Sequence, residues 1–382
     1  MPEPTDQPPA PITYADAGVD VEAGDRAVEL MKQAVAATHG PQVLGGIGGF
    51  AGLFDATELV GMRRPLLATS TDGVGTKVAV AQAMDVHHTI GIDLVGMVVD
   101  DIVVSGAKPL FMTDYIACGR VVPERVADIV RGIAEGCRLT GTALVGGETA
   151  EHPGLLDPDE YDVAGAATGV VEADAVLGPD KVRPGDVVVA MASSGLHSNG
   201  YSLVRRVLAA AGWGYERHVD ELGRTVGEEL LEPTRLYTPA CLALAGSPGA
   251  GVHAFSHVTG GGLAANLARV LPPGLTATID RCTWTPAPVF GLVARLGHVP
   301  RADLERTLNL GVGMVAVVAA ESAQAALRLL AEDGVDAWVM GSVELDPSQG
   351  PAATGEDVFR GAKGVHGGTV RMVGQYPAPW RQ

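Results

Sequence analysis

The sequence contains few basic residues, few cysteines and few aromatic residues. Of its 382 residues, 27 are Lys or Arg and 45 are Asp or Glu, which gives a formal net charge of −18 at pH 7. No Lys/Arg-rich block interrupts this acidic background, so the surface would repel nucleic acid and anionic lipid, and we expect neither as a partner. An anionic substrate must then be bound by local N–H groups, a few cations and a metal ion.

Cysteine chemistry and membrane insertion also have little support in the sequence. The chain has four cysteines, with no C-x-x-C pair and no His/Cys cluster of zinc spacing, so we expect reduced and mostly buried thiols. No apolar run reaches the roughly 18 residues of a membrane helix. The N-terminus is proline-rich and acidic, unlike a secretory signal. We therefore expect a soluble cytoplasmic protein without a membrane partner.

The composition that is present describes a folded protein of two domains. Hydrophobic residues make up 47% of the chain and charged residues 19%, enough for two cores of ordinary size. We predict a flexible arm over residues 1–12, which contain five prolines, and a first domain over 13–172. The proline-containing segment 172–185 is the best boundary. A second domain over 173–345 and a mobile Gly-, Pro- and Ser-rich tail over 346–382 follow.

Residues 69–77, TSTDGVGTK, organise the first domain. They follow a short apolar run and combine a carboxylate, Asp72, with two glycines, hydroxyl residues and Lys77. Carboxylate oxygens suit Mg²⁺, glycines let a backbone approach phosphates closely, and a lysine supplies a point charge. This mixture suits a metal-bound polyphosphate, although a glycine turn with solvated charges explains the nonapeptide equally well.

Two further glycine or carboxylate patterns lie in the first domain. The run 45–52 contains a G-x-G-x-x-A match, but no convincing strand precedes it, so we interpret it as a mobile loop that can close over phosphates rather than a dinucleotide fold. The apolar run 90–104 contains Asp93, Asp100 and Asp101. In a helix this spacing places them near one face, which favours a metal site over capping or ion pairing.

The remaining periodicities predict a small sheet that bears helices, followed by an α/β unit. We expect helices over 22–38, 123–139, 203–211 and 323–330, a helix starting near 263, and strands over 110–117, 163–171, 186–191 and 315–319. In the second domain, SSGLHSNG (193–200) lies between a strand and a helix, the usual setting of an anion pocket. His257 to Gly262 forms a second such loop, HVTGGG. Ser198 or Asn199 also suits a helix cap, and the loop histidine His197 could equally be incidental surface.

Taken in order, these motifs resemble one enzyme family. The set YADAGVDVEAGD, GGIGGF, STDGVGTK, GIDLVGM, GGETAEHPG, YDVAG, SSGLHSNGYSLVR, HVTGGG and NLGVGM is similar to that of the phosphoribosylformylglycinamidine cyclo-ligases, or aminoimidazole ribonucleotide synthetases, over roughly residues 14–343. The resemblance implies ATP- and Mg²⁺-dependent ring closure of formylglycinamidine ribonucleotide to 5-aminoimidazole ribonucleotide in purine synthesis. It also implies an α+β / α/β fold and a homodimer, in which the N-terminal sheets form a shared β-barrel with helices outside and a C-terminal α/β domain completes the site.

The resemblance assigns roles to residues of the motifs. The metal ligands would be Asp72, Asp93, Asp101 and Glu148. The nucleotide would be bound by Gly46, Gly48, Gly49, Asp72, Gly73, Gly75, Thr76, Lys77 and Asp93. The substrate would be bound by His197, Ser198, Asn199, His257, Thr259, Gly260 and Gly261. Asp72, Lys77 and His197 would be catalytic, with His197 transferring a proton because an unperturbed imidazole titrates near neutrality.

Two departures from the family pattern concern charge: Asp100-Asp101 replaces an Asn-Asp pair and Lys108 replaces an acid. Sister families with the same fold remain alternatives. A selenophosphate synthetase would need a cysteine near the N-terminal glycine loop, and a hydrogenase-maturation relative would end in a cysteine. The His197 and His257 loops argue against a thiamine-monophosphate kinase. A nucleotide-sensing binding protein without turnover is the alternative from another class.

Overall fold

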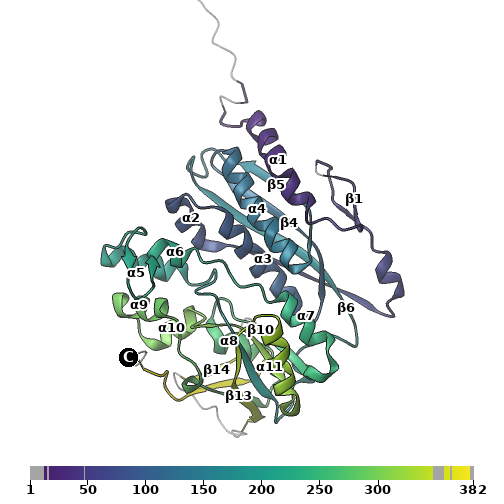
Figure 1. Ribbon diagram of the computed structural model, residues 1–382, viewed down its shortest axis with the longest axis vertical. Coiled ribbons are helices and arrows are strands. Elements are labelled where there is room, and N and C mark those ends of the chain that lie inside the picture. The colour runs from purple at the N-terminus through teal and green to yellow at the C-terminus, as the bar shows by residue number, and fades with distance from the viewer. Residues whose placement is uncertain (1–12, 15–16, 47, 347–356, 362–363, 379–382) are drawn as a thin grey trace, which may run out of the picture.

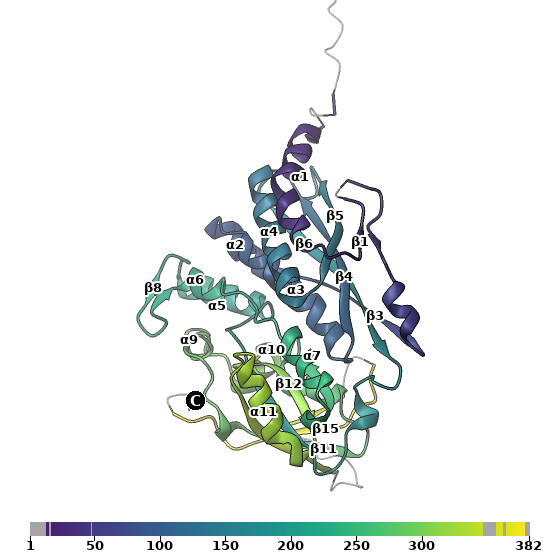
Figure 2. The ribbon, with the colours of Figure 1, turned by 45° about the vertical axis from the view of Figure 1, so that its right-hand side comes forward.

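A computed structural model describes residues 13–14, 17–46, 48–346, 357–361 and 364–378 of the chain. The arm predicted over residues 1–12 lies outside this description. The chain forms two halves, each built on one main sheet (Figures 1 and 2). None of the helices in the described part has the length and hydropathy of a membrane-spanning segment.

The N-terminal half is a four-stranded sheet in the order β3-β6-β4-β5, where only β4 and β5 are parallel. Its strands are β3 (Pro65–Gly73), β4 (Lys108–Cys118), β5 (Ala143–Glu151) and β6 (Tyr161–Glu172), with a separate hairpin of β1 (Val43–Leu44) and β2 (Leu53–Phe54). Its helices are α1 (Val21–Ala36), α2 (Val78–Met84), α3 (His88–Val103) and α4 (Pro123–Thr140). The glycine run 45–52 therefore connects the strands of a hairpin, whose short strands have no clear sequence signal.

Helices α1, α3 and α4 cover one face of this sheet (Figures 1 and 2). Helix α4 begins at Pro123, a residue pre-organised for a first helical position, and ends at Gly141 in the left-handed conformation. Helices α3 and α4 approach each other closely, because a Cβ at Gly91 would lie 2.3 Å from the carbonyl oxygen of Ile129. The opposite face is open in the single chain, and Thr71, Thr113 and Tyr115 are exposed on it.

The C-terminal half contains a seven-stranded sheet in the order β10-β12-β7-β13-β11-β15-β14. The strands are β7 (Val187–Ala192), β10 (Val252–His257), β11 (Leu275–Asp280), β12 (Val312–Val318), β13 (Ala337–Leu345), β14 (Val358–Arg360) and β15 (Thr369–Val373), beside a hairpin of β8 (His218–Val219) and β9 (Arg224–Thr225). The helices are α5 (Tyr201–Ala211), α6 (Val226–Leu230), α7 (Thr238–Gly246), α8 (Gly262–Arg269), α9 (Pro288–Gly297), α10 (Arg301–Thr307) and α11 (Ala323–Glu332). Strand β12 is buried along its whole length, as its unbroken apolar sequence requires.

The segment after residue 345 departs from the expected mobile tail. Strand β15 pairs in parallel with β11, and β14 closes the edge of the sheet. Phe359, Val370, Met372 and Tyr376 are all buried. Burial of these side chains stabilises the segment, and the prediction of a mobile tail is wrong for residues 357–361 and 364–376.

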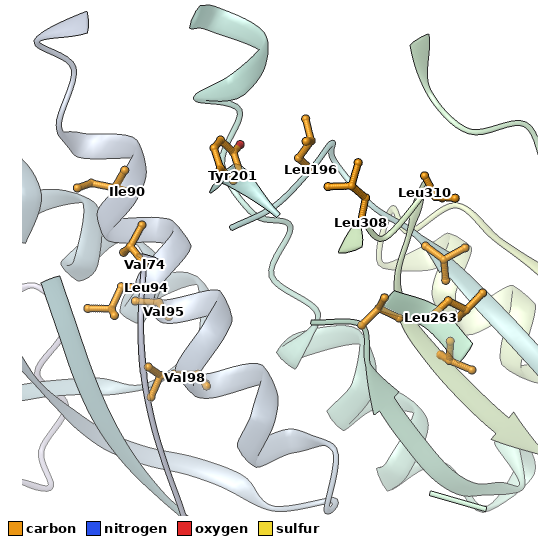
Figure 3. Close-up of a cluster of buried hydrophobic side chains, with 14 of the residues drawn as sticks. Val74, Ile90, Leu94, Val95, Val98, Leu196, Tyr201, Leu263, Leu308 and Leu310 are labelled. Carbon is orange, nitrogen blue, oxygen red and sulfur yellow. The ribbon is translucent and has the colours of Figure 1, made fainter. Parts of the chain in front are cut away.

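One apolar cluster joins the two halves (Figure 3). It runs from Leu94 and Val98 of α3 through Leu196 and Tyr201 to Leu308 beside α10, and all five are buried. Helix α3, buried on almost every side, is therefore the element on which the halves meet. The candidate site lies along the same junction.

Candidate active site at the junction of the two halves

The end of β3 brings Asp72 and the following turn to the junction. Asp72 Oδ1 accepts a hydrogen bond from the amide of Gly73 at 2.8 Å. Gly75 adopts a positive φ of 71°, which turns the chain into Thr76. The Thr76 hydroxyl lies 3.1 Å from that of Ser202 at the start of α5. The nonapeptide 69–77 thus contacts the second half directly.

Lys77 is buried and does not face an open pocket. Its Nζ donates to Asp93 at 2.9 Å, to the backbone carbonyl of His197 at 3.1 Å and to that of Glu232 at 2.7 Å. An ammonium group has three protons, so these three acceptors use its whole capacity. Burial lowers the pKa of Lys77 and the Asp93 carboxylate opposes this effect. In this structure Lys77 makes a contact between the halves, and its contact with nucleotide phosphates stays a prediction.

Asp93 and Asp100 also dock the halves instead of converging on a metal. Asp93 accepts from the Thr234 amide at 2.8 Å and its hydroxyl at 2.6 Å, in addition to its ion pair with Lys77. Asp100 accepts from the Thr238 hydroxyl at 2.7 Å, and burial raises its pKa to about 6. In this structure Asp93 Oδ1 has three buried hydrogen-bond partners and Oδ2 pairs with Lys77, while binding of metal or nucleotide by Asp93 stays a prediction. The threonine partners were missed, since nothing local in the sequence marks them.

Asp101, one residue further along α3, faces His257 at the end of β10. Its Oδ1 lies 2.8 Å from His257 Nδ1. Burial would lower the pKa of His257, but the bond to Asp101 and the charges of Asp101, Asp100 and Asp72 outweigh it and raise that pKa. Asp72 and Asp101 thus both act on one imidazole, which places the two predicted ligands in the same part of the molecule.

His197 lies in the loop before α5 with a φ of 62°, a conformation that is rare for a residue with a side chain. Its Nε2 accepts a hydrogen bond from the Ser194 amide at 3.2 Å. Burial, together with the nearby positive charges of His257, Lys77 and Arg235, holds its pKa well below the ordinary value. The reason given for proton transfer by His197, an unperturbed imidazole, therefore does not hold, because burial lowers the pKa of this group.

Three buried polar atoms of the loops 193–200 and 257–262 have no hydrogen-bond partner among the described residues: His197 Nδ1, Ser198 Oγ and His257 Nε2. Asp93 Oδ2, at the same junction, has only its ion pair with Lys77. The three residues are 1%, 8% and 6% exposed. Because buried polar groups in folded proteins are nearly always paired, such a group of atoms indicates a polar ligand. It lies where the loops 193–200 and 257–262 meet.

The loops 193–200 and 257–262 lie close to each other, and glycines at the start of α8 allow their backbones to approach. Gly261 and Gly262 have φ values of 109° and 75°, and α8 begins at Gly262. A Cβ on Gly260 would lie 3.5 Å from the side-chain oxygen of Asn199, so the predicted substrate residues of both loops are neighbours. Thr259 accepts through its carbonyl oxygen from Asn266 of α8 at 3.2 Å.

Asn309 supports the site, and no role was predicted for it from the sequence. Its side-chain amide donates to the carbonyl of Gly195 at 2.9 Å, and its oxygen accepts from Ser193 and from the Gly311 amide. It therefore fixes the start of the His197 loop. The only signal was its place in the motif NLGVGM.

The remaining predicted residues are not assembled into a cage of four carboxylates. Glu148 is exposed on β5, and Gly46, Gly48 and Gly49 lie in the β1–β2 connection. Within the described ranges, no three His, Cys, Asp or Glu side chains group as metal ligands. Mg²⁺ is commonly held by one or two carboxylates together with substrate phosphates, and Asp72 and Asp101 fit that donor set.

Two sequence families match the halves just described. The N-terminal domain of AIR synthase related proteins matches residues 58–171, and their C-terminal domain matches residues 183–351. The chain is also 52% identical, over 87% of its length and 96% of the relative's, to a phosphoribosylformylglycinamidine cyclo-ligase of Anaeromyxobacter sp. (strain Fw109-5). The fold and sequence thus define an AIR synthase related protein. Within this class, the chain belongs to the phosphoribosylformylglycinamidine cyclo-ligase family.

Two solved structures of other proteins share the fold. A thiamine-monophosphate kinase from Stenotrophomonas maltophilia K279a superposes with a TM-score of 0.61 at 17% identity, covering 92% of this chain and 97% of its own. A hydrogenase maturation protein HypE in complex with ATP gives a TM-score of 0.60 at 19% identity, covering 95% and 98%. At these identities the likeness concerns architecture alone.

Proposed function

We propose that the protein closes the imidazole ring of 5-aminoimidazole ribonucleotide from formylglycinamidine ribonucleotide, with ATP converted to ADP and phosphate. The observation that carries this proposal is the group of three buried, unpartnered polar atoms on His197, Ser198 and His257 where two glycine loops meet. The cyclo-ligase relative at 52% identity supplies the reaction that suits such a site.

The chemistry requires activation of a poor leaving group. An amide oxygen does not leave readily, so phosphoryl transfer from ATP converts it into an iminophosphate. An internal nitrogen then attacks the same carbon and inorganic phosphate departs. No covalent protein nucleophile is needed, and catalysis consists mainly of holding the reacting groups in line and stabilising charge.

We assign substrate recognition to the loops 193–200 and 257–262. Ser198 Oγ, Asn199, Thr259 and the amides of Gly260 and Gly261 would bind the ribose phosphate and the amidine end. Because Nε2 of His197 accepts from the Ser194 amide, the neutral imidazole would donate a hydrogen bond from Nδ1 to the substrate. His257, oriented by Asp101, presents Nε2 as a second polar group.

We assign nucleotide binding to the turn Gly73–Thr76 and to Gly46, Gly48 and Gly49, whose loop lies on a hairpin able to approach phosphates. HypE, a protein of the same fold, has been solved with ATP bound, which supports this half of the proposal. Asp72 and Asp101 would hold Mg²⁺, which neutralises charge on the transferred phosphoryl group. Lys77 then acts indirectly, by fixing the carbonyl of His197.

We further propose a cytoplasmic homodimer in which two N-terminal sheets close a shared barrel. Its support is the open face of the β3-β6-β4-β5 sheet, where Leu67 is 65% exposed and Tyr115 is 39% exposed. A sheet normally buries its apolar face, and a second copy would bury this one.

The test is a coupled measurement of ADP and product on the purified full chain with ATP, Mg²⁺ and formylglycinamidine ribonucleotide. Aminoimidazole product equal to ADP is the expected result. Release of ADP without aminoimidazole product, or ADP release independent of the substrate, would reject the cyclo-ligase assignment and point to a kinase of the same fold.

A further inference from the structure

The C-terminal segment lies beyond the matched family domain and yet contacts helix α10, which packs against the two candidate substrate loops. The family match ends at residue 351, whereas Asp357, strands β14 and β15, and Tyr376 follow it. We call these described residues, 357–361 and 364–376, the C-terminal clamp. The proposed reaction gives the clamp no role.

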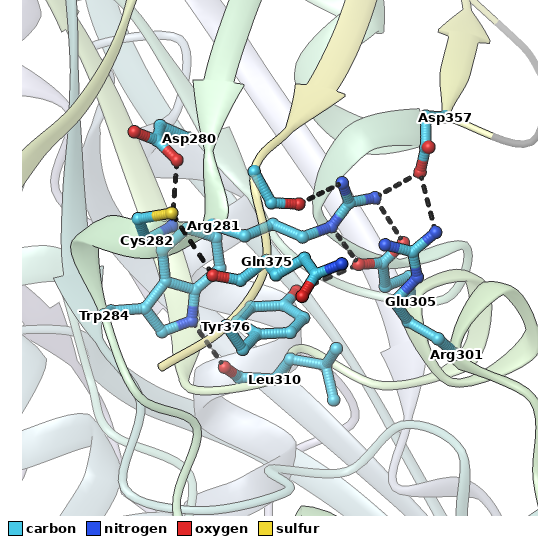
Figure 4. Close-up of polar contacts among 11 residues, drawn as sticks. Asp280, Arg281, Cys282, Trp284, Arg301, Glu305, Leu310, Asp357, Gln375 and Tyr376 are labelled. Carbon is cyan, nitrogen blue, oxygen red and sulfur yellow. Dashed lines mark hydrogen bonds and ion pairs between the residues drawn. The ribbon is translucent and has the colours of Figure 1, made fainter. Parts of the chain in front are cut away.

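The C-terminal clamp contacts helix α10 through a buried arginine (Figure 4). Arg281, which is 1% exposed, donates to both carboxylate oxygens of Glu305 on α10, at 2.6 Å and 2.9 Å. From the clamp, Asp357 accepts from Arg281 at 2.5 Å and from Arg301 of α10 at 3.2 Å. The Tyr376 hydroxyl donates to Glu305 at 3.1 Å. Asp357 and Tyr376 of the clamp therefore supply further hydrogen bonds to the buried ion pair of Arg281 and Glu305.

Helix α10 in turn supports both substrate loops by direct backbone contact. A Cβ on Gly262 would lie 1.8 Å from the carbonyl oxygen of Glu305, so the start of α8 rests on α10 with no space between them. A Cβ on Gly200 would lie 3.0 Å from the carbonyl oxygen of Thr307. A shift of α10 must therefore move both loops, because close-packed backbones transmit displacement.

A second path runs through the residues after α10. Tyr376 packs edge-on against Trp284 with ring centroids 5.2 Å apart. The indole of Trp284 donates to the carbonyl of Leu310 at 2.9 Å, next to Asn309, which fixes Gly195. The clamp thus reaches the His197 loop by two independent routes.

We propose that the C-terminal clamp positions the loops 193–200 and 257–262 for substrate binding, with Asp357 and Tyr376 as positioning residues that act through Arg281, Glu305 and Trp284. This inference rests on the proposed role of the loops in binding substrate. It adds residues outside the family domain to the determinants of substrate affinity. The ATP side, built on β3, lies outside the path.

The test compares full-length Asp357→Asn and Tyr376→Phe with a control on β13, Glu344→Gln, whose side chain contacts β15. Glu344 pairs with Arg371 of β15 at 2.6 Å but has no described contact with α10. The readouts are KM for each substrate, kcat, and amide hydrogen exchange of the two loops. We expect KM for formylglycinamidine ribonucleotide to rise about two- to thirtyfold in the Asp357 and Tyr376 variants, with faster loop exchange and an unchanged KM for ATP. Asp357→Glu should restore much of the affinity.

Unchanged loop exchange and substrate KM in both variants would overturn the proposal, as would an equal effect of Glu344→Gln, because that result would reflect general loosening of β15. Asn199→Ala tests substrate binding by the loops separately from their positioning by the clamp. If it leaves substrate KM unchanged, the loops do not bind substrate and the proposed function of the loops fails. Faster loop exchange in Asp357→Asn without a rise in KM overturns the positioning of substrate even where Asn199→Ala raises KM.

Discussion

Lys77 offers the sharpest test of the site, because the sequence and the structure give it different roles. A lysine on the nucleotide phosphates would be dispensable for folding, and its loss would raise KM for ATP. A lysine that is 0% exposed and bonded to Asp93 and two carbonyl groups should instead be needed for stability. The variant Lys77→Met separates these two outcomes.

The expected magnitude follows from the burial of the pair. Removing Lys77 leaves the carboxylate of Asp93 buried without its counter-charge, which typically costs about 3–5 kcal/mol. The free energy of unfolding should fall by that amount in urea titrations followed by circular dichroism. Lys32→Met is the control, because the Lys32–Glu29 pair is exposed and its loss should cost no more than about 1 kcal/mol.

The double variant Lys77→Met/Asp93→Asn completes the cycle. Neutralising Asp93 removes the unpaired charge, so the double variant should be more stable than Lys77→Met alone. A Lys77→Met protein with unaltered unfolding free energy and a raised KM for ATP would refute this reasoning and return Lys77 to the phosphates. A double variant no more stable than the single one would show that the two charges are not coupled.

Four further variants test separate parts of the structure. Burial raises the pKa of Asp114 from 3.8 to about 7. The folded state therefore binds the Asp114 proton more tightly than the unfolded state, so the free energy of unfolding falls as pH rises from about 4 to 7. Asp114→Asn should remove up to about 4 kcal/mol of this pH-dependent fall in stability. Urea titrations across that pH range measure the effect. Gly262→Ala should destabilise the fold by about 2 kcal/mol or more in thermal unfolding, since its Cβ meets the Glu305 carbonyl, whereas Gly260→Ala has space and should spare stability while raising substrate KM. Asp72→Asn should lower Mg²⁺-dependent turnover about 100-fold without altering unfolding; near-normal turnover at saturating Mg²⁺ would reject Asp72 as a ligand.

Local periodicity predicted part of the regular elements, namely helices α1, α4, α5, α8 and α11 and strands β4, β6, β7 and β12. The apolar stripe of residues 123–139 became α4, and the run 90–104 became most of α3, because both patterns depend only on neighbours a few residues apart. Asp93 and Asp100 of α3 are buried with partners, as the cost of burying an unpaired carboxylate requires. Their partners could not be predicted, since Thr234 lies 141 residues from Asp93 and is defined only by the docking of the halves.

The C-terminal clamp shows why its Gly-, Pro- and Ser-rich composition led to a wrong prediction of mobility, since its order depends on packing against distant residues. Glycines near its strands suggested mobility, yet a Cβ on Gly367 would lie 2.0 Å from the carbonyl oxygen of Ala268, and one on Gly368 would lie 2.6 Å from that of Leu275. These glycines allow backbones to approach and are not signs of a flexible chain. Strand β15 is also paired with β11, nearly 100 residues away, which no local pattern reveals.

The junction of the halves and the substrate loop depend on the same contacts. The His197 loop is held from the first half by Lys77, which donates to the His197 carbonyl at 3.1 Å, and from the second half by Asn309, which donates to the Gly195 carbonyl at 2.9 Å. Loss of either donor leaves a carbonyl of this loop without its partner. Variants that loosen the junction should therefore lose substrate affinity at denaturant concentrations below those that unfold either sheet, because the loop has fewer contacts to lose than the cores.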